Sequence, residues 1–515
     1  MRFLSLLAAA LLALGVAAPV KAQDDRPDLR IAVNALPGTL EGIEHMGNIT
    51  IRMTYNVFDH LIFRDFLGDG SGKDTGLMPG LAESWSRVDD RTIELKLREG
   101  VKFHNGQELT SDDVVFSLSP GRGHGYAAVM PVDNFLGKVS HVIPVDRYTV
   151  QIVFKKPDPV IEQRIATYGF FIVPAREYIT VGKDNFARNP VGTGPYMLDE
   201  WVEGEYIRYK AFDEYWGGKP TAASLTFISV PEVSARVAGL VSGEYDLVVN
   251  IPPDQYATIE GYDDLKMAPI VLDNTHLLVF VNEGPLKDKR IRKAMSLAID
   301  RDLLREALWF DQNMTPNGHQ MPSYPLYMED YPAWEYSPEK AKALLEEAGY
   351  DNEEIVYRLP LNYYLLSLEA AQAVQQMWQE VGLNVKLEPA ENWSQALAPG
   401  VHVHPTSNTH FLPDPSGPLA IAHGPTSGIQ MNRQYPERSW PAPERFNELI
   451  DIFETKFDTQ VRKDAFWEAL EIWQDETPAT MLYNPLEGYA LRANINWKPY
   501  SLYYMDFRPY NLSFE

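Results

Sequence analysis

The chain is 515 residues long and strongly acidic, with 71 Asp and Glu against 46 Lys and Arg and a formal net charge of −25 at pH 7. Such a charge argues against binding to nucleic acids or to anionic lipids, which attract basic proteins. The chain contains no Cys, which excludes disulfides, thiol chemistry and lipid attachment to an N-terminal Cys. Its length exceeds what one hydrophobic core usually supports, so two or more lobes are expected.

The first 22 residues have the pattern of an export signal. Arg2 gives a positive start, residues 4–18 are almost unbroken apolar sequence, and Val20 and Ala22 supply small residues on the N-terminal side of a cleavage site. The apolar run is shorter than the roughly 20 residues that a membrane-spanning helix needs. We expect cleavage after Ala22 and a soluble exported chain that begins at Gln23. A retained membrane anchor is the alternative.

The next part of the chain is expected to alternate short strands with helices. Residues 29–35 predict a strand, and the loop 36–45 that follows either faces a cleft or lies in solvent. Apolar residues at helical spacing predict a helix at 54–66. The glycine-rich stretch 68–72 has acidic flanks, which favour a calcium-binding or plain solvated turn over a phosphate-binding loop.

Residues 77–119 have the pattern of scaffold. Leu81 and Trp85 are expected to be buried anchors, and residues 93–97 alternate as a strand with one face inside. A helix is expected to begin at Ser111 or at the residue after it. We assign no ligand contact to this block.

The most specific stretch of the sequence is NPVGTGPYMLDEWVEGEYIRYKAFDEYWGGKP, at 189–220. A turn at 190–195, rich in Gly and Pro, needs special backbone angles. Two strands at 196–201 and 206–211 follow, with Gly204 in the reversal between them. A second turn, Tyr-Trp-Gly-Gly, closes the hairpin.

The residue order of this hairpin resembles the family 5 solute-binding proteins of bacterial ABC importers, the peptide and nickel group. The matching pattern is G-T-G-P-Y at 192–196, a Trp a few residues later, and Tyr-Trp-Gly at 215–217. Residues 81–116 and an A-I-D-R run at 298–301 resemble the family as well. The resemblance implies an α/β, bilobal periplasmic-binding-protein fold of the large, three-domain type II variety, with a hinged ligand cleft.

The resemblance also implies a division of the chain. Residues 23–55, 190–270 and 480–515 would form a discontinuous lobe I, residues 56–189 a middle domain inserted into it, and residues 271–479 lobe II. No Gly/Ser-rich tether stands out in the sequence. We therefore expect short strands to cross between the lobes, which favours a hinged cleft over independent domains.

Local patterns predict the remaining elements. A strand–helix–strand unit at 225–250 is consistent with parallel pairing. From residue 480 the chain is expected to return as strands. Further strands are predicted at 276–282 and 383–387, and helices at 288–299, 337–349, 367–381, 441–457 and 460–476.

The most informative region for the ligand is SNTHFLPDPSG, at 407–417. Peptide-binding members of the resembling family typically have an Asp-Pro or Glu-Pro step here, with another acid three residues earlier that pairs with the peptide's amino group. Asp414 matches the step, but Phe411 stands at the earlier position and cannot pair with an amine. Some dipeptide-binding members also hold the ligand's carboxylate with an Arg, and residues 359–364 contain none.

Both ends of a simple peptide therefore lose their expected partners. We predict a wall of aromatic and hydrogen-bonding side chains, which suits a modified amino acid such as an opine-like conjugate, a sugar-bearing ligand, or a peptide held by its backbone. Each of these residues taken alone has packing as its alternative role. The predicted ligand contacts are Asn362, Tyr363, Tyr364, Trp393, Asn408, His410, Phe411 and Asp414.

Metal and catalytic motifs give little support for other functions. His402 and His404 would share a strand face as a candidate metal pair near His423, but no Cys or carboxylate at ligand spacing supports them. The sequence has no H-E-x-x-H, G-x-S-x-G or G-x-x-x-x-G-K-[ST] motif. We predict no metal ligand, no cofactor and no enzyme, and keep a secreted hydrolase as the alternative from another class.

The expected function is the periplasmic substrate-binding component of an ABC importer. It would capture a peptide-like or amino-acid-conjugate (opine-like) solute and deliver it to an inner-membrane permease and ATPase complex. An oligosaccharide and a metal chelate are the alternative ligands, and the protein is expected to be a monomer with no nucleic-acid partner. Closure of such a cleft must be favoured by ligand contacts that are made only in the closed state.

Overall fold

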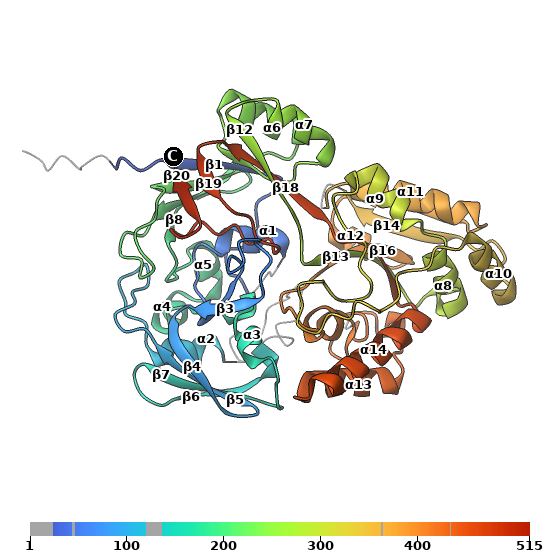
Figure 1. Ribbon diagram of the computed structural model, residues 1–515, viewed down its shortest axis with the longest axis horizontal. Coiled ribbons are helices and arrows are strands. Elements are labelled where there is room, and N and C mark those ends of the chain that lie inside the picture. The colour runs from blue at the N-terminus through green and yellow to red at the C-terminus, as the bar shows by residue number, and fades with distance from the viewer. Residues whose placement is uncertain (1–23, 44–46, 120–135, 362–363, 433) are drawn as a thin grey trace, which may run out of the picture.

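Two α/β lobes lie side by side in the computed structural model (Figure 1), which describes residues 24–43, 47–119, 136–361, 364–432 and 434–515. We call the described residues up to 271 and from 485 onward the first lobe, and residues 273–484 the second lobe. The expected export signal lies outside the described residues. Within the part of the chain that is described, no helix combines the length and the apolar character needed to cross a membrane.

A seven-stranded mixed sheet forms the upper part of the first lobe. Its strand order is β12-β18-β11-β1-β10-β9-β8, and β1 pairs in parallel with both β10 and β11, which α6 (Val233–Ser242) connects. This arrangement confirms the predicted strand–helix–strand unit. A short helix, α7 (Tyr256–Glu260), precedes β12. The strands are β1 (Asp28–Val33), β8 (Tyr196–Val202), β9 (Tyr206–Ala211), β10 (Ser224–Ser229), β11 (Leu247–Val248), β12 (Leu265–Val271) and β18 (Leu486–Arg492).

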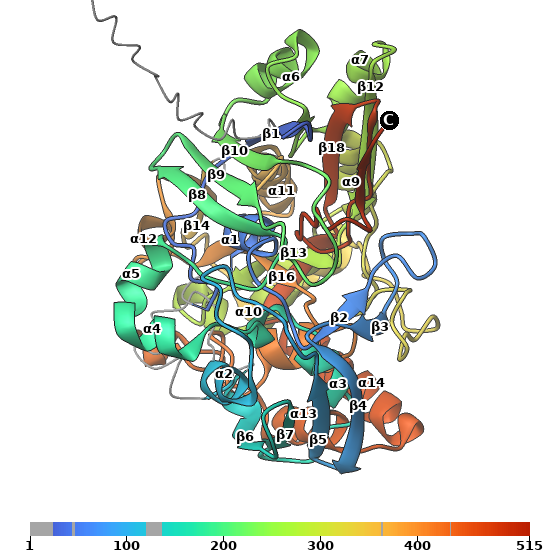
Figure 2. The same ribbon diagram turned by 90° about the vertical axis from the view of Figure 1, so that its left-hand side faces the viewer.

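A four-stranded antiparallel sheet lies below the seven-stranded sheet (Figure 2). Apolar side chains of both sheets belong to one buried cluster, so the two layers share a core. Leu81 is fully buried there, as predicted, whereas Trp85 is half-buried. The elements of this region are α1 (Asn48–Thr54), β2 (Ile62–Asp65), β3 (Gly76–Pro79), β4 (Ala82–Asp89), β5 (Thr92–Leu97), α2 (Ser111–Ser117), β6 (Val139–Pro144), β7 (Thr149–Phe154), α3 (Ile161–Ile165), α4 (Ala175–Val181) and α5 (Lys183–Arg188).

The predicted helix at 54–66 is wrong. Helix α1 ends at Thr54, and residues 62–65 form β2, which pairs with β3. Residues 57, 58, 61 and 62 are all fully buried, so their apolar spacing marks a segment enclosed on every side. The carbonyl of Val57 accepts a hydrogen bond from Gly194 N (2.9 Å), outside any helix.

A five-stranded mixed sheet forms the centre of the second lobe, in the order β15-β14-β16-β13-β17. The predicted helices are confirmed with small shifts at their ends, and Asp288 and Ser337 cap two of them as N-terminal residues. The strands are β13 (Asn274–Phe280), β14 (Ile355–Pro360), β15 (Val385–Ala390), β16 (Val403–Thr409) and β17 (Ala479–Tyr483). The helices are α8 (Lys289–Leu297), α9 (Arg301–Trp309), α10 (Pro338–Ala348), α11 (Ser367–Glu380), α12 (Trp393–Ala396), α13 (Glu444–Thr455) and α14 (Thr459–Glu476).

The chain passes between the lobes twice, between β12 and β13 and between β17 and β18. The crossings are a few residues long and lie against each other, because Leu272 N donates to Pro485 O (3.0 Å). The expected boundary at residue 480 falls inside β17, which pairs with β13, so the return to the first lobe comes at 484–485. The last strands, β19 (Ile495–Trp497) and β20 (Leu512–Phe514), pair with each other and lie beside the seven-stranded sheet.

Candidate functional site

The G-T-G-P-Y turn packs against the main chain of residues 56–59. A side chain at Gly192 would place its Cβ 1.9 Å from the carbonyl oxygen of Val57, so only glycine fits. Tyr196 N donates to Asn56 O (3.1 Å) and continues the contact. The turn therefore holds the seven-stranded sheet to the segment that follows α1.

Asp59 is the polar centre of this contact. Its carboxylate accepts hydrogen bonds from Thr193 Oγ1 (3.0 Å) and Trp216 Nε1 (2.7 Å), so both turns of the hairpin meet there. It also pairs with Arg508 (2.7 Å), and both side chains of that pair are fully buried. Arg508 pairs in addition with Asp506 (2.9 Å). The most specific motif of the sequence is thus part of the scaffold.

A small cavity of about 30 Å³ lies between the lobes next to the crossings, and we call it the hinge cavity. At its edge, Thr409 Oγ1 of the second lobe donates to Asn48 Oδ1 of the first (3.3 Å). A water-sized group needs roughly 10–15 Å³ of such space, so the cavity holds a group of two or three heavy atoms. Its lining residues are Asn34, Asn48, Ile49, Arg52, Asn250, Leu486, Glu487 and Tyr503 of the first lobe, His276, Tyr364 and Leu365 of the second, and Pro485 of a crossing.

Buried charges stand on the first-lobe side of the hinge cavity. Arg52 of α1 and Glu487 of β18 form an ion pair (3.0 Å), and each side chain is only 4% exposed. Asn250 donates to the same carboxylate from its main chain (2.9 Å) and from its side chain (3.1 Å). The guanidinium of Arg52 also lies over the ring of Tyr503, 5.1 Å from its centre.

Aromatic side chains stand on the second-lobe side. Tyr364, one of the predicted contacts, lines the hinge cavity, and its hydroxyl accepts a hydrogen bond from Ser407 N (3.0 Å). Its ring lies 4.7 Å from that of His276 and 6.1 Å from that of Trp393. The structure thus brings together two predicted residues, Tyr364 and Trp393. Two others, Asn362 and Tyr363, lie outside the described residues.

Asn408 and His410 are buried inside the second lobe and do not line the hinge cavity. Asn408 Nδ2 donates to Pro418 O (2.7 Å). The imidazole of His410 contacts Tyr324 Oη through Nδ1 (3.0 Å) and Thr275 Oγ1 through Nε2 (3.2 Å). Burial lowers the pKa of His410 to about 3, so its ring is neutral at physiological pH. Their role in binding stays a prediction.

Phe411 and Asp414 both contact other residues of the protein, Phe411 through apolar packing and Asp414 through an ion pair. Phe411 is 3% exposed and belongs to the buried apolar cluster of the first lobe, although it follows β16 of the second. Both carboxylate oxygens of Asp414 accept from Arg462 (2.8 and 2.7 Å), and one also accepts from Ser416 N (3.1 Å). Neither residue lines the hinge cavity, and ligand contact by either stays a prediction.

The candidate histidine pair makes separate contacts. His402 Nδ1 accepts from Val356 N (3.0 Å), and His404 Nδ1 contacts Pro405 O (3.2 Å). His423 instead packs against His319, with 4.6 Å between ring centres. Among the residues described, no three His, Asp or Glu side chains stand close enough to hold a metal ion.

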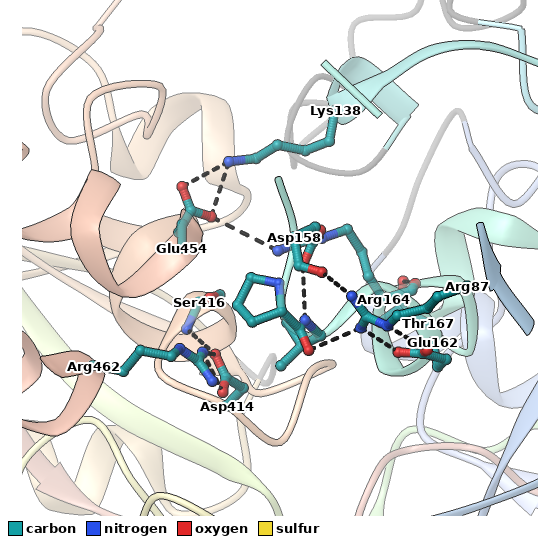
Figure 3. Close-up of polar contacts among 12 residues, drawn as sticks. Arg87, Lys138, Asp158, Glu162, Arg164, Thr167, Asp414, Ser416, Glu454 and Arg462 are labelled. Carbon is teal, nitrogen blue, oxygen red and sulfur yellow. Dashed lines mark hydrogen bonds and ion pairs between the residues drawn. The ribbon is translucent and has the colours of Figure 1, made fainter. Parts of the chain in front are cut away.

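The lobes also meet far from the crossings, along a seam of charges (Figure 3). Lys138 of the first lobe pairs with Glu454 of α13 (2.7 Å). Lys156 of the first lobe pairs with Asp451 of α13 (2.5 Å). Arg164 lies 3.9 Å from Glu454. We call these five residues the charged seam. Because it joins opposite sides of the cleft, it exists only when the lobes are together.

Sequence reasoning missed Arg52, His276 and Glu487. The available signal was a single charge inside an otherwise apolar or uncharged stretch, as in ITIRMTYNVF around Arg52 and PLEGYA around Glu487. A charge in such a segment is buried with a partner or close to a ligand.

Two lobes joined by two short crossings, with a polar cavity between them, define a hinged solute-binding protein. The structure resembles the ABC transporter-associated periplasmic binding protein DppA from Helicobacter pylori in complex with the peptide STSA, with a TM-score of 0.83. That superposition covers 95% of this chain and 99% of the other at 20% sequence identity. It shows the fold of periplasmic binding proteins.

The chain belongs to the bacterial extracellular solute-binding proteins of family 5, because the model of that family's middle region matches residues 76–427. It is 25% identical to di/tripeptide-binding protein 2 of Pseudomonas aeruginosa (strain UCBPP-PA14), over 96% of this chain and 97% of the other. It is 30% identical to the dipeptide-binding protein of Escherichia coli (strain K12), over 63% of this chain and 65% of that protein's length. The chain is a binding protein and not an enzyme.

Proposed function

We propose that this chain captures a peptide-like or amino-acid-conjugate solute in the periplasm and presents it to an inner-membrane ABC permease and its ATPase. The observation that carries this proposal is the pair of adjacent crossings beside a polar interlobe cavity. The names of the two relatives, a dipeptide-binding and a di/tripeptide-binding protein, support a peptide-like ligand.

The protein works by capture and release. A solute that enters the open cleft is enclosed as the lobes rotate about the crossings, and contacts from both lobes then favour the closed form. Tyr364 and Trp393 supply aromatic surface for this enclosure, and Asn34, Asn48 and Asn250 supply amide groups. Export with cleavage after Ala22 and action as a monomer are parts of the same proposal.

Native mass spectrometry of the purified mature chain tests the proposal, followed by calorimetric titration with di- to tetrapeptides. The expected result is one bound peptide or amino-acid conjugate per chain, with an unfolding midpoint that rises with ligand concentration. Peptides that bind neither in the spectrometer nor in the calorimeter would contradict the proposed ligand class. Saturable binding of an oligosaccharide or a metal chelate would then favour those alternatives.

A further inference from the structure

The guanidinium of Arg52 has hydrogen-bonding capacity that its neighbours leave unused. Nη1 donates to Asn250 Oδ1 (3.1 Å) and Nη2 donates to Glu487 Oε2 (3.0 Å). Nε is fully buried and has no partner among the described residues. A buried N–H without an acceptor is costly, so a group that supplies one in this place gains free energy on binding.

Glu487 does not supply that acceptor, because its carboxylate accepts three hydrogen bonds and none of them comes from Arg52 Nε. Oε1 accepts from Asn250 N, and Oε2 accepts from both Asn250 Nδ2 and Arg52 Nη2. The first-lobe side of the hinge cavity therefore has a buried donor, Arg52 Nε, that lacks an acceptor. The ligand group that complements this side of the cavity is a hydrogen-bond acceptor.

A second buried cation makes the charge around the hinge cavity positive. Arg236 of α6 is 1% exposed and donates to four main-chain carbonyls, those of Val230, Pro231, Val249 and Asn250, at 2.7–3.1 Å. Burial lowers its pKa to about 10, Glu487 raises it and Arg52 lowers it, so this guanidinium is charged at neutral pH. Arg52, Arg236 and Glu487 together therefore carry a net charge of +1, although only Arg52 pairs directly with the carboxylate.

His276 of β13 faces the same cavity from the second lobe. Its Nε2 is buried and has no partner among the residues the structure describes. Burial lowers the pKa of His276 to about 3, so the ring is neutral and donates when Nε2 carries its proton. A small acceptor group in the hinge cavity would therefore face a donor from each lobe, Arg52 Nε and His276 Nε2.

We propose that the hinge cavity is a subsite for a carboxylate group of the solute, which Arg52 binds from the first lobe and His276 binds from the second, beside the charge of Arg236. The inference rests on the proposed function and narrows it to solutes that carry a carboxylate. The cavity volume of about 30 Å³ suits such a terminal group rather than a whole solute. Because the two donors stand on different lobes, the carboxylate stabilises the closed form.

Acetate and acetamide test the subsite without knowledge of the natural solute, because they have similar size and only acetate is charged. At constant ionic strength, acetate is expected to raise the thermal-unfolding midpoint of the mature chain with increasing concentration, and acetamide is not. The double variant Arg52→Gln/Glu487→Gln removes both charges of the ion pair together, so the net charge near the cavity is unchanged, and it should lose the response to acetate. Arg445→Gln, which breaks an exposed pair with Glu468, should keep it.

Three peptides distinguish the source of the carboxylate: trialanine, trialanine amide and Ala-Glu-Ala amide. By calorimetry, at least one of the two carboxylate-bearing peptides is expected to bind about tenfold or more tightly than trialanine amide, the strength of a charge-assisted contact. The preference should disappear in the double variant and fall several-fold in His276→Phe.

Two results would overturn the subsite: an acetate response that the double variant retains, or equal binding of all three peptides to the unaltered chain. If no peptide binds at all, the proposed ligand class fails. The acetate comparison then still decides whether the hinge cavity accepts a carboxylate.

Discussion

At the scale of single residues, the buried carboxylate of Asp59 explains why Thr and Trp stand in the two turns of the hairpin at 189–220. Thr193 and Trp216 reach it from the two turns of one hairpin, and Arg508 reaches it from the end of the chain. Since these partners are far apart in sequence, a single carboxylate fixes three segments of the first lobe. The motif therefore belongs to the scaffold of this lobe, and its residues do not line the hinge cavity.

Asp59→Asn is expected to destabilise the protein by about 3 kcal/mol, because it leaves part of a buried guanidinium's charge unbalanced. Asparagine keeps the size of the side chain, so the loss reports the charge and not a cavity. Urea denaturation measures it. Asp199→Asn, at a half-exposed pair with Arg208, is the control and should change stability by less than about 1 kcal/mol. Equal effects of the two substitutions would contradict the structural role of Asp59.

Trp393 and Asp414, both predicted ligand contacts, are expected to respond differently to alanine. Trp393 is half-buried at the start of α12 beside Tyr364, so Trp393→Ala should weaken peptide binding several-fold with little change in the unfolding midpoint. Asp414→Ala leaves the buried Arg462 without its carboxylate and should lower the midpoint strongly. Calorimetry and thermal unfolding on the same preparations separate the two effects. Unchanged affinity in Trp393→Ala would remove it from the site.

Only part of the candidate site could be predicted from the sequence. Tyr364 and Trp393 were found because aromatic residues cluster near the stretch where the resembling family binds its ligands. Arg52 and Glu487 were not, because they meet only after the chain has crossed between the lobes and returned, 435 positions apart. No local pattern records such a pairing. Asp414 matches the Asp-Pro step in sequence, but in the structure its carboxylate pairs with the buried Arg462. Phe411 departs from the family pattern and packs in a buried apolar cluster.

At the scale of elements, local patterning predicted most of the second lobe. Its long helices have one apolar face and clear caps, such as Ser337 at the start of α10 and the left-handed Gly349 after it. The failure at 54–66 has the opposite cause, since that segment is buried all round and its periodicity carries no information about which face lies inside. The hairpin of β8 and β9 was predicted almost to the residue, because Gly204 marks its reversal.

Helix α13 is expected to influence ligand affinity although it lies away from the hinge cavity. The variant Asp451→Asn/Glu454→Gln removes the acids of the charged seam, so the closed form loses contacts that the open form never makes. Peptide affinity at low salt should fall about two- to tenfold, as expected for exposed and half-exposed pairs. The difference from the unaltered chain should vanish in 1 M NaCl, where such pairs are screened.

The charge-swapped pair Lys156→Asp/Asp451→Lys is the matched control for the charged seam, since no third charge of the seam pairs with either residue. It should recover part of the lost affinity, because opposite charges again face each other. An unchanged affinity of Asp451→Asn/Glu454→Gln at low salt would show that the seam does not contribute to closure.

At the scale of the whole molecule, buried histidines make stability depend on pH. Burial lowers the pKa to about 3 for His60, His276, His410 and His423, and to about 4 for His104 and His404. The unfolded chain binds protons at these residues below about pH 6.5 and the folded chain does not, so stability is lost as pH falls below that value. The urea midpoint should therefore drop between pH 7 and pH 5. His60→Phe should reduce the slope, and a midpoint that rises on acidification would contradict this account.

Because Leu272 N bonds to Pro485 O, the second lobe is one uninterrupted piece of polypeptide with neighbouring ends. The second lobe is therefore a single insertion that can be deleted from the gene as one contiguous segment. A fragment of residues 273–484 should fold by itself, with a cooperative melt by circular dichroism, and a short Gly-Ser bridge from 272 to 485 should seal what remains.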